Sequence, residues 1–489
     1  MKIAYVASEM IPFAKTGGLA EVTGTLAHEV RRLGHEVIAF IPRYKMVDAQ
    51  KLDLRVEIEH MEVPVGSERE TVKVSSYTFK DGVQIYFIEH PEFYAREGLY
   101  GTPLGDYPDN DRRFILFQRA VLETLRAVDF RPDLIHCHDW QTGLIPVYLK
   151  TLYSQDQFFQ KTRTVFTIHN LGYQGNFPPD SLPATGLGWE HFTMERLEFY
   201  GKVSFIRGGI VDADMVTTVS DRYSKEIQTK EFGCGLEGVL AKRREHLTGI
   251  INGINFEEWD PEKDADIPFP YNAKNVTQKS KNKAALQKEN ELEIKANTPL
   301  LGIVSRLVDQ KGLDILIPSL ESIFQMGIQV VLLGTGDEKY HKVLRDMAKK
   351  NKEHCGFHIL FDPKMAKRIY AGADMILYSS YYEPCGLGQM ISLRFGAVPV
   401  VRATGGFVDT IEEFQPTTLK GNGFIFEDYS SEALLAAVGR ALDTYREPRL
   451  WKRLVQNAMA CDFSWSASAK QYAALYQRTQ RRAIQGLGK

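Results

Sequence analysis

The feature that most constrains the fold is an alternation of short apolar, β-rich runs with helix-like segments in the first half of the chain. Residues 3–7 predict a strand, residues 19–33 a helix that ends at Gly34, and residues 37–41 the next strand. This pattern is typical of βαβ units, in which helices cover both faces of a parallel sheet. Further strands are expected at residues 85–88, 134–137, 164–168 and 215–219.

The same alternation restarts at Leu300 after a Pro-containing and then Lys/Asn/Glu-rich break at residues 255–298. The chain has 489 residues, more than one hydrophobic core usually organises, so two domains are expected. We expect a first domain at residues 1–250, a second at 251–460, and a C-terminal helix within 461–489 that packs back on the first domain. In the second domain, strands are expected at residues 300–304, 329–333, 375–377 and 398–401, with a helix at 313–326.

Charge and composition exclude several kinds of partner. The chain has 60 Lys and Arg residues against 62 Asp and Glu residues, so no broad positive field attracts nucleic acid or an acidic membrane. The lysine cluster at residues 274–283 is expected to be a solvated face or loop, with an anion site as the alternative. Five dispersed cysteines, no signal peptide and no bilayer-length apolar run indicate a cytoplasmic protein. Nothing in the sequence indicates an oligomeric state.

Polar residues follow expected strands of the first domain, at the level where open α/β sheets bind ligands. Lys15, Gly17 and Gly18 lie between the first strand and its helix, where glycines let the backbone approach a ligand and a lysine adds positive charge. A plain turn with a surface lysine is the alternative. Asp139 and His169 each follow a later strand, and a carboxylate there can receive sugar hydroxyls or a proton. A core histidine bonded to backbone is the alternative for His169.

The second domain supplies cations at corresponding places. Arg306 and Lys311 come directly after its first strand, where a diphosphate would arrive, although two surface charges are the alternative. Glu383 and Gly386 precede a helix, so backbone amides are exposed at its positive end while the carboxylate is available to sugar hydroxyls. Thr404 begins a similar arrangement one strand later.

Two other interpretations are weaker. The pair His136 and His138 suggests a metal, but no further His, Asp or Glu cluster completes a coordination shell, so no metal is expected. Cys385 is a conceivable nucleophile, but the sequence places no histidine beside it, so we expect a packing or ligand-lining thiol.

Taken in order, these segments resemble bacterial glycogen synthases and plant starch synthases over nearly the whole chain. The blocks at residues 15–19 and 138–140 are most characteristic of that family, whereas the Arg/Lys and Glu-Pro-Cys-Gly-Leu blocks are shared loosely with other GT-B glycosyltransferases. The matching segments are residues 15–19, 136–140, 168–170, 251–253, 305–307, 310–312, 383–387 and 404–406.

The resemblance implies a GT-B fold, with two Rossmann-like α/β domains whose parallel sheets face each other across a deep cleft. It implies transfer of glucose from ADP-glucose to the non-reducing end of an α-1,4-glucan, with retention of configuration and without a cofactor or metal. The catalytic residues expected are Asp139, His169, Arg306, Lys311 and Glu383. The substrate-binding residues expected are Lys15, Gly17, Gly18, Asn252, Gln310, Phe361, Cys385, Gly386, Leu387, Gly388 and Thr404, with Phe361 stacking on adenine.

Two departures from the family pattern bear on mechanism. Ile391 stands where relatives often carry a second acidic residue, about two helical turns after Glu383, which weakens a two-carboxylate mechanism. Glu21 replaces a frequent aspartate and keeps its charge. Front-face displacement and a covalent intermediate both stay open. The alternative functions are a GT-B enzyme that uses UDP-glucose or a small sugar, a nucleotide-sugar epimerase, and a non-catalytic glucan-binding paralogue.

Overall fold

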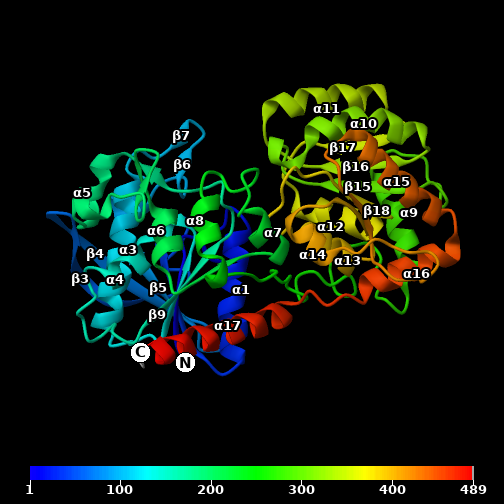
Figure 1. The fold of residues 1–489 in the computed structure, drawn as a ribbon. Helices are drawn as coiled ribbons and strands as arrows, with labels where there is room; N and C mark the ends of the chain where they lie inside the picture. Colours follow the sequence, from blue (N-terminus) through cyan, green and yellow to red (C-terminus); the bar gives the residue numbers. More distant parts are fainter. Residues whose placement is uncertain (487–489) are drawn as a thin grey trace. The chain divides into compact units, whose positions relative to one another are not determined.

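The structure is a computed structural model that describes residues 1–486, with side chains described up to residue 481. The chain divides into two compact units (Figure 1). Unit 1 contains Met1–Ile250 together with residues 465–486, and unit 2 contains Ile251–Ser464. None of the helices in the described part of the chain combines the length and hydropathy that a bilayer-spanning helix requires.

Unit 1 is built on a sheet of nine strands in the order β14-β13-β9-β8-β1-β2-β5-β4-β3. All neighbours from β14 to β5 are parallel. After β1 and β2 the chain forms the edge hairpin of β3 and β4, comes back to add β5 beside β2, and then crosses to the other side of β1 as β8, which makes a topological switch point between β1 and β8. The bounds of these parallel strands are β1 Lys2–Val6, β2 Glu36–Pro42, β5 Gln84–Glu89, β8 Leu134–His138, β9 Arg163–Ile168, β13 Met215–Thr218 and β14 Leu247–Gly249.

The edge strands β3 (Arg55–Val65) and β4 (Glu68–Thr78) extend this sheet as an antiparallel hairpin. The sequence-based strand assignments do not include it. Buried residues alternate with less buried ones only locally, at Val63 and Val65 of β3 and at Val72 and Val74 of β4, and most of the other positions are exposed or half-buried, unlike the continuous apolar run of a parallel strand. Smaller sheets pair β6 (Gly101–Thr102) with β7 (Gly105–Asp106), and β10 (Asn176–Phe177) and β11 (Glu198–Phe199) with β12 (Lys202–Ser204).

The C-terminal helix α17 (Trp465–Gly486) belongs to the core of unit 1. It lies against α1 (Gly18–Arg32), and its residues Trp465, Tyr472 and Tyr476 are buried in one cluster with apolar residues of β1. Their spacing places them on one helical face. The other helices of unit 1 are α2 (Pro91–Tyr94), α3 (Asn110–Ala127), α4 (Leu144–Lys150), α5 (Leu182–Thr185), α6 (Phe205–Asp212), α7 (Asp221–Glu226) and α8 (Glu237–Lys242).

Unit 2 contains a six-stranded parallel sheet in the order β17-β16-β15-β18-β19-β20. This is the strand order of a dinucleotide-binding Rossmann sheet, with the switch point between β15 and β18. The strands are β15 Leu300–Val304, β16 Gln329–Leu333, β17 Cys355–His358, β18 Met375–Tyr378, β19 Val398–Arg402 and β20 Phe424–Phe426. The helices are α9 Lys279–Glu289, α10 Leu313–Gln325, α11 Glu338–Lys350, α12 Pro363–Gly372, α13 Gly388–Arg394, α14 Gly405–Thr410, α15 Ser431–Tyr445 and α16 Pro448–Met459.

The lysine cluster is only in part the solvated face or loop that its charge predicts. Lys274 and Lys281 are exposed, whereas Lys279 and Lys283 lie in α9 and are buried. Lys279 Nζ donates to the carbonyls of Tyr370 and Ala371, both at 2.9 Å, and Lys283 Nζ lies 2.7 Å from a carboxylate oxygen of Asp374. These partners satisfy the buried amines. They are remote in sequence, so the local density of charged residues does not reveal them.

Candidate functional site

A cavity of about 220 Å³ lies at the switch point of the unit 2 sheet, lined by the loops that follow β15 and β18. Crevices at this position are the usual ligand sites of open α/β sheets. The predicted residues that line it are Arg306, Lys311, Glu383, Gly386, Leu387 and Gly388. The predicted residues of unit 2 that do not line it are Asn252, Gln310, Phe361, Cys385 and Thr404.

Lys311 and Glu383 form an ion pair in this cavity. Lys311 Nζ lies 2.5 Å from Glu383 Oε2, and the Ser380 hydroxyl donates to the same oxygen at 3.1 Å. Gly312 has φ +68°, and a Cβ there would lie 1.9 Å from the carbonyl oxygen of Ser379. Glycine is therefore required for the turn that brings Lys311 to Glu383.

Arg306 is exposed and follows β15 directly. Its Nη2 donates to Gln310 Oε1 at 3.3 Å, and Gln310 Nε2 donates to the carbonyl of Tyr382 at 3.1 Å. Gln310 thus holds the guanidinium from one side. Most of the five N–H donors of Arg306 stay available to a ligand.

Three buried polar atoms near residues 383–389 have no hydrogen-bond partner within the described part of the chain: Asn252 Oδ1, Gln389 Oε1 and Thr404 Oγ1. Buried polar atoms are normally paired, so these three are available to a ligand. Burial raises the pKa of the Cys385 thiol, which is consequently a packing group and not an activated nucleophile. Phe361 is 82% exposed in the loop after β17.

In unit 1 a buried carboxylate that the sequence does not reveal, Glu9, holds the glycine loop. Its Oε2 accepts from the backbone N–H of Thr16 at 2.5 Å and of Gly17 at 3.3 Å. Its Oε1 accepts from the Thr16 hydroxyl at 2.6 Å and from the Tyr100 hydroxyl at 2.7 Å. Glu9 therefore fixes the loop that carries Lys15.

The fold does not itself require glycine at positions 17 and 18. A Cβ at Gly17 or Gly18 would meet no atom within 4 Å, and Gly17 has an extended φ of −156° that any residue can adopt. Gly17 is the N-cap residue of α1, where glycine is common, and both glycines leave the backbone open to close approach by a ligand. Lys15 is exposed and pairs with Glu21.

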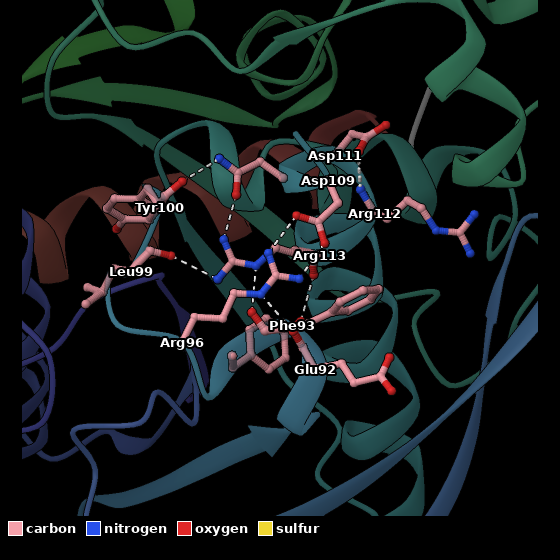
Figure 2. A network of polar contacts seen from close by, with 11 residues as sticks. Glu92, Phe93, Arg96, Leu99, Tyr100, Asp109, Asp111, Arg112 and Arg113 are labelled. Carbon is pink, nitrogen blue, oxygen red and sulfur yellow. Dashed lines mark hydrogen bonds and ion pairs between the residues drawn. The ribbon is translucent and has the colours of Figure 1, made fainter. Parts of the chain in front are cut away.

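Arg113, fully buried in α3, fastens the loop that precedes this helix (Figure 2). Its Nε donates to the Phe93 carbonyl at 2.7 Å, and its Nη2 to the Leu99 carbonyl at 2.9 Å. Its Nη1 donates to Asn110 Oδ1 at 2.6 Å, and Asn110 Nδ2 donates to the Tyr100 carbonyl at 2.9 Å. The network thus positions the tyrosine whose hydroxyl bonds the buried carboxylate.

Asp139 and His169 lie together after the neighbouring strands β8 and β9. Asp139 Oδ1 accepts from the backbone N–H of His169 at 2.7 Å. Asp139 has φ 57° and ψ −178°, a region that is almost exclusive to glycine, and such strain is often held at functional sites. Burial raises the pKa of Asp139 to about 7, and the negative charge of Glu9 adds to this effect. The carboxyl group of Asp139 can consequently hold a proton near neutrality.

His136 and His138 pack beside each other, with ring centroids 4.1 Å apart. No group of three or more His, Cys, Asp or Glu residues in the described chain has the geometry to hold a metal ion. His136 bonds the hydroxyls of Tyr476, at 2.8 Å, and Thr167, at 2.6 Å, so it is a core histidine.

Protein-family models match both units. The starch synthase catalytic domain matches residues 2–242, and glycosyl transferases group 1 matches residues 286–459. Glycogen synthases from Geotalea daltonii and Moorella thermoacetica are 47% and 46% identical to this chain, and the alignments cover 98% and 99% of it and 98% of each relative.

Solved structures of two glycosyltransferases also match this chain. The catalytic domain of starch synthase IV from Arabidopsis thaliana, bound to ADP and acarbose, matches with a TM-score of 0.89 at 33% identity, over 98% of this chain and 99% of that chain. Sucrose-phosphate synthase from Thermosynechococcus elongatus matches with a TM-score of 0.59 at 17% identity, over 98% of both chains, which is a likeness of fold alone.

Proposed function

This chain belongs to the family of glycogen and starch synthases, and we propose that it transfers glucose from ADP-glucose to the non-reducing end of an α-1,4-glucan with retention of configuration. The sequence-based predictions of a GT-B fold and of a glucan-synthesising glycosyltransferase are confirmed. ADP in the related starch synthase IV structure supports ADP as the leaving nucleotide here.

The observation that carries the proposal is the cavity that Arg306, Lys311 and Glu383 share at the unit 2 switch point. Breaking the bond between the anomeric carbon and the diphosphate leaves a more negative nucleotide and an electron-poor sugar. Fixed cations lower this barrier because they stabilise charge that develops in the transition state. Arg306 and Lys311 take that role, and Glu383 addresses the hydroxyls of the donor glucose.

In unit 1, Lys15 and the glycine loop are proposed to bind substrate phosphate, and Asp139 and His169 are proposed to bind substrate hydroxyls. As the anomeric carbon loses its bond to the diphosphate it bonds to the 4-hydroxyl oxygen of the acceptor, and the proton of that hydroxyl passes to an oxygen of the departing diphosphate. Glu383 is the one carboxylate among the described residues that line the unit 2 cavity, and the apolar Ile391 also lines it. A mechanism with two carboxylates in this cavity is therefore disfavoured.

The direct test incubates the protein with glycogen and either ADP-glucose or UDP-glucose, with and without chelator, and follows nucleotide release together with polymer size. We expect ADP release that matches polymer growth and is insensitive to chelator. Preference for UDP-glucose, or growth only on a small sugar, would replace the donor or acceptor assignment. Conversion of the donor without growth indicates an epimerase, and glucan binding without ADP release indicates a non-catalytic paralogue.

Substitutions in the cavity test the site assignment. Lys311→Met and Glu383→Gln keep side-chain size, and each should lower transfer by about 100-fold or more because an electrostatic contact of the transition state is lost. Lys263→Ala removes a lysine that is 81% exposed and should leave transfer unchanged. Near-normal turnover in either cavity variant would remove the assignment.

The glycine loop offers a second test. Gly18→Ala should keep or slightly raise the melting temperature, because Gly18 is the first residue of α1 and a Cβ there meets nothing within 4 Å, yet it should weaken donor binding. Gly439→Ala is the control, since Gly439 lies within α15 and also has open space around it. It should keep activity and gain up to about 1 kcal/mol of stability. Full activity in Gly18→Ala would contradict a role of the loop in substrate contact.

A further inference from the structure

His169 is held by a second histidine that the mechanism above does not use. His138 Nδ1 lies 3.0 Å from His169 Nε2, and the two ring centroids are 5.3 Å apart. His138 is fully buried at the end of β8, whereas His169 is partly exposed after β9. His169 Nδ1 makes no hydrogen bond within the described residues, so it is available to a ligand.

Both rings are neutral at physiological pH. Burial lowers the pKa of His138 well below its usual value, and the neighbouring histidines His136 and His169 lower it further. Burial also lowers the pKa of His169 to about 3. A neutral imidazole carries one proton on one of its two nitrogens. One of the two facing nitrogens must therefore carry a proton, and the other must accept it.

Two arrangements satisfy this condition. In the first, His138 Nδ1–H donates to His169 Nε2, which puts the proton of His169 on Nδ1. In the second, His169 Nε2–H donates to His138 Nδ1, which puts the proton of His138 on its own Nε2.

The other nitrogen of His138 decides between them. His138 Nε2 is buried and has no hydrogen-bond partner within the described part of the chain. In the first arrangement this nitrogen is an unpaired acceptor, and in the second it is an unpaired N–H donor. Among backbone groups, buried N–H donors without an acceptor are rarer than under-satisfied carbonyl acceptors, and we apply the same preference to the ring nitrogens of His138. The first arrangement is favoured.

We propose that His138 is a positioning residue that fixes His169 in the tautomer protonated on Nδ1, so that His169 presents an N–H donor to an oxygen of the bound sugar. The nitrogen bonded to a partner sets which ring nitrogen remains for the ligand. The identity of the ligand rests on the proposed function, whereas the tautomer does not.

The tautomer can be measured without any substrate. In protein labelled with ¹⁵N-histidine, two-dimensional ¹H–¹⁵N spectra distinguish a protonated ring nitrogen from an unprotonated one, and His169→Asn identifies the signals of His169. We expect an unprotonated Nε2 and a protonated Nδ1. His138→Phe removes the donor and keeps an aromatic ring, and it should shift His169 toward the other tautomer. A proton on Nε2 in the unmodified protein, or an unchanged tautomer in His138→Phe, would overturn the proposal.

Two further variants separate positioning from a structural role. His136→Gln removes the ring that packs beside His138 but leaves the His138–His169 hydrogen bond in place. The tautomer of His169 should therefore stay unchanged even where the melting temperature falls. His138→Asn places an amide where Nδ1 stood. It should restore part of the Nδ1-protonated signal, and it serves as the test variant if His138→Phe does not fold. Equal tautomer spectra in His138→Asn and His138→Phe would count against the proposal.

Kinetics give an independent readout. With ADP-glucose and glycogen, His138→Phe should lower kcat/KM for the donor by about 10- to 100-fold, and His138→Asn should recover part of the loss. If His136→Gln lowers kcat/KM as much as His138→Phe does, both histidines affect activity only through the stability of the fold. Failure of the unmodified protein to extend glycogen would refute the proposed function but leave the tautomer result intact.

Discussion

Replacing Glu9 tests the claim that one buried carboxylate organises the glycine loop. In Glu9→Ala the four hydrogen bonds from Thr16, Gly17 and Tyr100 are lost, and bonds to a charged acceptor contribute about 1.5–3 kcal/mol each. Three of the four come from exposed residues whose donors water can satisfy again. We therefore expect a net loss of about 2–3 kcal/mol, and a melting temperature lower by about 4–12 °C.

Glu9→Gln should cost less than Glu9→Ala. The amide can turn its oxygen toward the backbone N–H groups of Thr16 and Gly17, and its nitrogen toward the hydroxyls, which can rotate to accept. The bonds survive without the charge, so we expect a loss of about 1 kcal/mol. Glu59→Gln is the control, since it removes the same charge from an exposed ion pair with Lys73 and should stay within about 0.5 kcal/mol.

Both Glu9 variants should also move the titration of Asp139. The charge of Glu9 contributes to raising the pKa of Asp139, so removing it should lower that pKa, while burial keeps it above the usual value. The midpoint of the pH–rate profile, or of the carboxyl signal in protein labelled with ¹³C-aspartate, should move to lower pH. Equal melting temperatures for Glu9→Ala and Glu9→Gln, or an unmoved Asp139 midpoint, would refute the reasoning.

Two further substitutions test buried cations. Burial lowers the pKa of Lys279 to about 7, so the folded chain binds fewer protons than the unfolded chain above that pH, and stability should rise with pH between about 7 and 9 by at most about 2–3 kcal/mol. Lys279→Met should lack this rise in urea unfolding at each pH, and an unchanged slope would contradict the pKa assignment. Arg113→Lys should lower stability by about 2–4 kcal/mol, because one amine cannot reach three separated acceptors. Limited proteolysis should then cut the loop at residues 95–109 faster. An unchanged cleavage rate would argue that Arg113 does not hold this loop in place.

Most parallel strands of the two sheets could be predicted because they are continuous apolar runs between turn signals, whereas the short edge strands β14, β17 and β20 were not predicted. β1, β8 and β15 fall where residues 3–7, 134–137 and 300–304 predict them. The predicted polar residues then fall at strand ends because the switch points of these sheets lie there. Lys311 and Glu383 are brought together in this way although 72 positions separate them.

The supporting residues could not be predicted, because their roles depend on partners that are remote in sequence. Glu9 and Tyr100 are 91 positions apart, and neither belongs to a segment with a recognisable chemical pattern. For His138 the sequence suggests only a metal site with His136, which is not expected because further ligands are missing, and it indicates no other role, whereas the structure gives it His169 as a partner. The sequence predicts Lys279 as a solvated charge, because it does not show that the carbonyls at the end of α12 lie beside its amine.

The two lysines for which donor contacts are proposed share one feature: each is paired with a carboxylate. Lys311 is paired with Glu383 and Lys15 with Glu21, so a diphosphate that binds either lysine exchanges one anionic partner for another. The exchange limits the net gain in affinity, since each lysine is already satisfied. At Lys311 it also releases Glu383, whose carboxylate then becomes free to accept hydroxyls of the glucose attached to that diphosphate. Binding of the phosphate end would thereby prepare the group that orients the sugar, so the two variants Lys311→Met and Glu383→Gln should be less than additive in their effect on transfer.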